Sequence, residues 1–203
     1  MKRTIEEHFK NNLKSYLAIS VFFILGLIIG ISSINNMKTE QKTELTSYFE
    51  NFINETKNNS NINYTTLLDN SIKNNLKFIA LIVILSFSIW GEVSTCALMG
   101  YRGFSLGYTI SSAITILGIG KGMCFAVSLM LFSEIIYIPA IFFISIFSIK
   151  KYKELIDKEY ENKKTLIARY LIALFITTIC AIFSSFMKTY FNTNLFLMFA
   201  KYF

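Results

Sequence analysis

The chain alternates between long apolar runs and short polar segments, and this pattern predicts helices that cross a lipid bilayer. No charged side chain occurs in residues 15–37, 103–120 or 170–187. A helix needs about 20 apolar residues to cross a hydrocarbon core about 30 Å thick, because each residue adds about 1.5 Å. We therefore expect five spans, at residues 15–34, 78–98, 104–119, 123–149 and 166–187.

Each span is expected to be helical, because lipid offers no hydrogen-bond partners to an irregular backbone. The predicted fold is all-α, a polytopic transmembrane helical bundle formed by one integral membrane domain over residues 1–203. Pro139 removes one internal hydrogen bond from the fourth span. That span is therefore either one kinked helix, which we favour, or a broken helix. The aromatic tail, residues 189–203, is expected at the membrane interface.

The largest polar segment, residues 35–77, contains two amphipathic patterns separated by a polar hinge at residues 57–63. Apolar side chains recur at helical spacing in both halves, so two short helices are expected. Their apolar faces either rest on the membrane surface or dock the extracellular part of a partner, and the pattern leaves both interpretations open. The candidate docking residues are Leu45, Tyr48, Phe49, Phe52 and Ile53.

The distribution of basic residues predicts the orientation of the chain. Five spans place twelve of the 20 Lys and Arg residues on the side of the N-terminus and eight on the other side. Because positive residues favour the cytoplasmic side, we expect a multi-pass protein of the cell membrane with a cytoplasmic N-terminus. Residues 35–77 then lie outside the cytoplasm.

Composition argues against a soluble enzyme and against nucleic-acid binding. Apolar residues make up 53% of the chain and charged residues 16%, whereas about a quarter of a soluble domain is charged. The net charge of +7 comes from basic residues that punctuate apolar runs, which is typical of orientation signals. His8 is the only histidine, so the sequence offers no metal site, no cofactor site and no base–nucleophile pair. We predict that the protein is not an enzyme.

Small residues and two acids are the candidate functional positions inside the spans. Glycines four residues apart let helix backbones approach closely, within the chain, which we favour, or in a homo-oligomer or partner complex. Acids at membrane depth indicate a proton or ion path by default, and the alternative is a structural polar pair in which Glu92 reaches Arg102. A transporter or permease subunit using Glu92 and Glu134 is therefore the competing function. The candidate small residues are Gly26, Gly30, Gly103, Gly107 and Ser111. The candidate intramembrane polar positions are Glu92 and Glu134, together with Pro139.

The order and spacing of several motifs resemble the stage II sporulation protein M family of endospore-forming bacteria. The motifs are GLIIG at residues 26–30, SYFENFI at 47–53, NNLK at 74–77, GYRGFSLGYT at 100–109, read as a turn that opens the third span, and IPA at 138–140 after Glu134. The resemblance implies a non-enzymatic membrane scaffold on the mother-cell side of the sporulation septum. It further implies two partners, the cell-wall hydrolases stage II sporulation proteins D and P, which remodel septal peptidoglycan during forespore engulfment. We expect these partners to contact the glycine faces and the docking residues.

Overall fold

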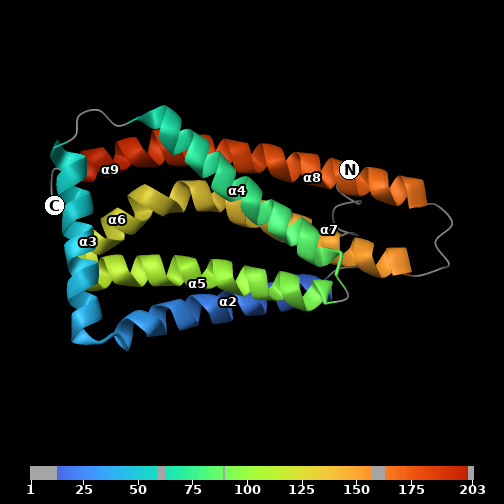
Figure 1. The fold of residues 1–203 in the computed structure, drawn as a ribbon, viewed down its shortest axis with the longest axis horizontal. Coiled ribbons are helices and arrows are strands. Elements are labelled where there is room, and N and C mark those ends of the chain that lie inside the picture. The colour runs from blue at the N-terminus through green and yellow to red at the C-terminus, as the bar shows by residue number, and fades with distance from the viewer. Residues whose placement is uncertain (1–12, 59–62, 89, 157–162, 201–203) are drawn as a thin grey trace.

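The computed structural model describes residues 13–58, 63–88, 90–156 and 163–200, and this part of the chain is helical throughout apart from short turns. Long helical rods lie side by side, and the shorter helix α3 crosses one end of them (Figure 1). The rods are α2 (Leu13–Asn35), α4 (Tyr64–Ser86), α5 (Gly91–Leu117), α6–η1–α7 (Ile119–Ala126, Val127–Leu131 and Phe132–Ile156) and α8–η2–α9 (Lys163–Phe186, Met187–Asn192 and Thr193–Ala200), and α3 spans Thr39–Asn58.

Three segments of these rods are long and apolar enough to cross a bilayer. They are Leu13–Asn35, Phe132–Ile149 and Ile167–Phe199, and their mean hydropathies are 2.6, 2.0 and 2.1. The expected fold class, an all-helical membrane bundle, is consistent with this architecture. The expected number of five spans is not confirmed, because α4 and α5 fall short of the same hydropathy.

The second and third expected spans have the wrong boundaries. Residues 78–98 do not form one helix, because α4 ends at Ser86 and α5 begins at Gly91. Between them the chain turns, and the Gly91 amide donates to the Ser88 carbonyl at 2.9 Å. Gly91 permits this turn because a Cβ there would lie 2.5 Å from the Ser86 carbonyl oxygen. The GYRGFSLGYT segment, expected as a turn, instead lies in the middle of α5.

The first half of α4 is polar, and only residues 78–85 are continuously apolar. Asp69 and Lys73 form an exposed ion pair of 2.6 Å one helical turn apart. By contrast, α2 exposes large apolar side chains along its whole length, from Leu13 to Ile31. The two helices therefore present very different surfaces to their surroundings.

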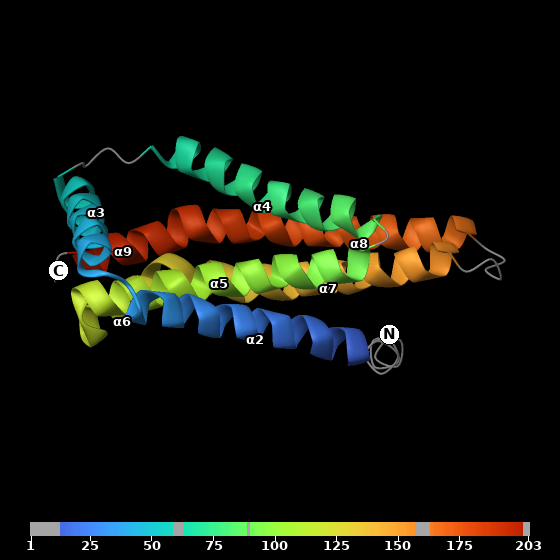
Figure 2. The ribbon, with the colours of Figure 1, turned by 60° about the horizontal axis from the view of Figure 1, so that its bottom comes forward.

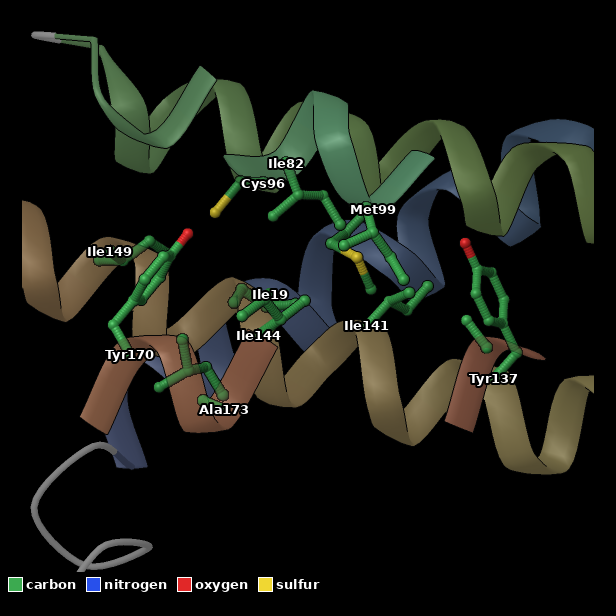
Figure 3. Close-up of a cluster of buried hydrophobic side chains, with 13 residues drawn as sticks. Ile19, Ile82, Cys96, Met99, Tyr137, Ile141, Ile144, Ile149, Tyr170 and Ala173 are labelled. Atoms are coloured by element: carbon green, nitrogen blue, oxygen red, sulfur yellow. The ribbon is translucent and has the colours of Figure 1, made fainter. Parts of the chain in front are cut away.

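A buried cluster joins all the long rods (Figure 3). Ile19 of α2, Ile82 of α4 and Met99 of α5 meet Ile141 of α7 and Tyr170 of α8 there. All five side chains are at most 4% exposed. The cluster shows that α4 and α5 belong to the same core as the three more hydrophobic rods.

The helical irregularities lie at positions that were not expected. The fourth rod passes through Pro139 as regular α-helix and instead widens to a π-helix at Val127–Leu131. The last rod continues past residue 187 through a second π-helix to Ala200. Phe196 is buried in it, so residues 189–200 pack as part of the bundle. Their expected place at the membrane interface stays a prediction. Residues 59–62 of the expected hinge and 201–203 of the tail lie outside the described part.

Prediction of sidedness. The turn at Ser88 and helix α3 lie at opposite ends of the bundle (Figure 2). With a cytoplasmic N-terminus, a membrane-impermeant maleimide should label Ser47→Cys in intact cells and Ser88→Cys only after permeabilisation. Cys96, Cys124 and Cys180 are first replaced by alanine. If Ser88→Cys alone were labelled in intact cells, the orientation would be the opposite one, with the N-terminus outside the cytoplasm. If Ser88→Cys were not labelled under either condition, residues 78–98 would instead form a single span.

Candidate functional site

The predicted glycines form a seam between α2 and α5. Gly26 faces the carbonyl of Gly100, and Gly30 faces the carbonyl of Phe104. From the other side, Gly103 and Gly107 face backbone carbonyls of α2, at Phe23 and Leu27. A Cβ at any of these four glycines would overlap the opposite backbone. The structure thus uses these glycines for packing within the chain, and Ser111 is half-buried one turn beyond Gly107.

The register of the seam gives the depth of each residue of α5. Gly26 meets Gly100 and Gly30 meets Phe104, while Gly103 meets Phe23 and Gly107 meets Leu27, so α2 and α5 run in the same direction with Gly26 level with Gly103. Arg102 therefore lies beside Leu25. At 1.5 Å per residue, this level is about 18 Å from the start of α2 at Leu13 and about 15 Å from its end at Asn35.

Arg102 and Glu134 form an ion pair inside the bundle at this level. An Nη atom of Arg102 donates to Oε1 of Glu134, and the side chains are 21% and 12% exposed. The guanidinium lies over the rings of Tyr137, at 5.0 Å, and Phe78, at 5.9 Å. Nε of Arg102 and Oε2 of Glu134 are buried without a hydrogen-bond partner among the described residues. The pair keeps both charges compensated where lipid would not solvate them.

This geometry corrects the expected partners of the two acids. Glu92 is exposed in the first turn of α5, ten residues before Arg102 on the same helix, so it cannot form the pair. Glu134 forms it instead. Pro139 is exposed on α7 and takes no part. Arg102 was expected as a loop residue that Glu92 reaches, and its place inside a helix was missed, although the 27 residues of α5 contain no proline that would end a helix.

Side-chain amides connect the rods on either side of the ion pair. The side-chain amide of Asn75 on α4 donates to the Ser185 hydroxyl at 2.9 Å, and the backbone carbonyl of Asn75 accepts from the Tyr137 hydroxyl at 3.0 Å. Asn192 joins the two π-helices, because its amide donates to the Leu129 carbonyl at 3.0 Å and to the Ser133 hydroxyl at 3.1 Å. A wider helical turn frees backbone carbonyls for such bonds. Sequence reasoning missed both asparagines, although each is a polar residue at the edge of an apolar run.

The apolar face of α3 covers the end of the chain's own bundle. Phe49 and Ile53 are buried there. The ring of Phe52 lies 5.6 Å from that of Phe196, and Leu45 is half-buried in the same cluster. Only Tyr48 points away, with 67% of its surface exposed. Of the five expected docking residues, four are therefore used chiefly within the chain, where their face packs against the bundle.

The arrangement offers packing and charge compensation but no reactive group of residues. Within the described ranges, no three His, Cys, Asp or Glu side chains come close enough to hold a metal ion. Cys96 is buried, Cys124 is exposed and Cys180 lies between these extremes, and all three are free thiols. His8 lies outside the described residues.

Comparisons with known proteins give one family. The family model described as stage II sporulation protein M matches residues 19–192, which run from within α2 to the end of η2. No curated protein and no solved structure matches the chain significantly.

Prediction for the seam. Gly26→Ala should lower the free energy of unfolding in detergent by about 1–3 kcal/mol, because its Cβ must push α2 and α5 apart. Gly120→Ala is the matched control, since no atom lies within 4 Å of a Cβ there. It should be neutral or stabilise the helix by up to about 1 kcal/mol. Equal stability of Gly26→Ala and wild type would contradict the seam.

Prediction for the ion pair. Arg102→Ala should destabilise the protein by about 3–5 kcal/mol, because it leaves Glu134 charged and unpaired in the bundle. The double variant Arg102→Met/Glu134→Leu removes both charges and should recover most of that loss. Thermal unfolding in detergent measures both effects. If the double variant were as unstable as the single one, the pair would not be the reason for the loss.

Proposed function

The chain belongs to the stage II sporulation protein M family, and from this premise we propose that it is a non-enzymatic scaffold for peptidoglycan hydrolases at the sporulation septum. The family makes it a sporulation-related membrane protein. The proposed role is to hold stage II sporulation proteins D and P in the membrane while they remodel the septal wall during engulfment. Its proposed location is the mother-cell side of the septum.

The observation that supports a scaffold most directly is the internal use of the charged and small residues. Arg102 and Glu134 compensate each other, and the glycines join α2 to α5. The buried amides connect the remaining rods. Such an interior holds helices in fixed positions, which suits a protein that positions others.

Helix α3 is the surface we propose for the hydrolases. It lies across the end of the bundle that a cytoplasmic N-terminus places outside, where the catalytic parts of cell-wall enzymes work (Figure 1). Its apolar face is covered by the bundle, so a partner meets the uncovered sides of the helix. Tyr48 lies at the edge of the covered face beside Phe49 and is a large exposed aromatic residue. Such residues are frequent anchors in protein interfaces.

The competing function, a transporter or permease subunit, has less support. Glu92 is exposed in the first turn of α5, far from Glu134. Glu134 is paired with Arg102, which favours a structural role for its charge. The Arg102→Met/Glu134→Leu variant separates the two functions. A scaffold with this variant should still support engulfment, whereas a transporter that depends on Glu134 should not.

Prediction for partner capture. Tagged wild-type protein should co-purify proteins D and P from sporulating cells solubilised in mild detergent. Tyr48→Ala should reduce the captured amount about tenfold, as expected for an interface anchor worth about 1.4 kcal/mol or more. Trp90→Ala is the control, because Trp90 is equally exposed at the opposite end of the bundle.

Two results would contradict the proposal at different points. Failure of the wild-type protein to capture either hydrolase would reject the scaffold function. Equal capture by the wild type and by Tyr48→Ala would reject α3 as the contact surface and leave the scaffold function standing.

A further inference from the structure

One face of α5 is open although helices flank it on both sides. Figures 1 and 2 show α2 along one side of α5, and α4 approaching the other side only near the turn that joins them. Val93, Ala97 and Tyr101 are exposed on this face at successive turns of the helix. Tyr101 is 64% exposed. The face thus carries a small side chain at Ala97 beside a large one at Tyr101.

Tyr101 lies close to the middle of the bilayer. The offset of the seam places it beside Ile24, the middle residue of α2. About 16 Å of helix separates this level from either end of α2.

The Tyr101 hydroxyl makes no hydrogen bond with any described residue. Tyrosines at membrane surfaces keep the hydroxyl in interfacial water, but Tyr101 lies too far from either end of α2 to reach it. Hydrocarbon supplies no hydrogen-bond partner, so an unpaired hydroxyl at this depth is unfavourable. A side chain from outside the bundle can provide the missing acceptor.

We propose that this face of α5 binds a transmembrane helix of another protein. The helix carries a hydrogen-bond acceptor, an amide, hydroxyl or carboxylate side chain, opposite Tyr101 and a larger apolar side chain opposite Ala97. A second copy of this chain fits less well. A two-fold axis along the membrane normal would place Ala97 opposite Ala97, where two small side chains leave a gap, although paired Tyr101 hydroxyls could bond each other.

The inference rests on the proposed scaffold function, because that function supplies a membrane-anchored partner. The α3 surface then holds the partner outside the membrane, and the α5 face holds its membrane helix. The two contacts lie on different elements, so substitutions can separate them.

The test measures capture of co-expressed, full-length hydrolase partners in detergent. Tyr101→Phe removes only the hydroxyl and should lower capture about threefold or more, the effect of one hydrogen bond between membrane helices. Ala97→Phe replaces a small side chain by a bulky one and should lower capture further. Tyr108→Phe is the control, because Tyr108 lies beside Ile31, about 6 Å from the end of α2, where interfacial water is closer. Melting temperatures equal to that of the wild type show that the variants are folded.

Three outcomes would overturn the inference. If the wild type captured the hydrolases and neither Tyr101→Phe nor Ala97→Phe reduced that capture, the α5 face would be rejected and the scaffold function would stand. Absence of capture by the wild type would reject the scaffold function and this contact with it. A disulfide between two Tyr101→Cys chains, formed in native membranes without the natural cysteines, would assign the face to a second copy.

Discussion

The contact between α2 and α5 backbones is the constraint on which the rest of the structure depends. Apolar side chains give little drive for association inside lipid, so close packing of small residues must supply it. Four glycines allow this packing, and their constant offset fixes the depth of Arg102 and of Tyr101. With α5 fixed, Arg102 reaches Glu134 on α7, and the pair sets the position of the third long rod.

The sequence predicted the apolar rods well where charge and hydropathy change sharply. The first span was expected at residues 15–34 and is Leu13–Asn35, and the glycine spacing correctly indicated close helix packing. The error at residues 78–98 has a local cause. The SFSIWG segment is apolar enough to continue a span, and its turn depends on hydrogen bonds of Ser88 and on space at Gly91.

The site was harder to predict because it depends on contacts between distant segments. Glu134 was expected at depth, but its partner depends on Arg102 lying within a helix, which the misplaced turn concealed. The apolar face of α3 was recognised from its spacing, yet no pattern shows that the faces of α6 and α9 would cover it. Periodicity identifies a face that must be covered, and only the fold identifies what covers it.

The polar first half of α4 has a consequence for the surrounding lipid. On the α2 side the apolar surface extends over residues 15–34, or about 30 Å, whereas on the α4 side it extends over residues 78–85, or about 12 Å. A flat bilayer of uniform thickness cannot match both sides. The protein must tilt or the bilayer must thin beside α4, and either adjustment costs energy that grows with the mismatch. A membrane that is already thinned or strongly curved lowers that cost, so the shape of the bundle by itself favours such places.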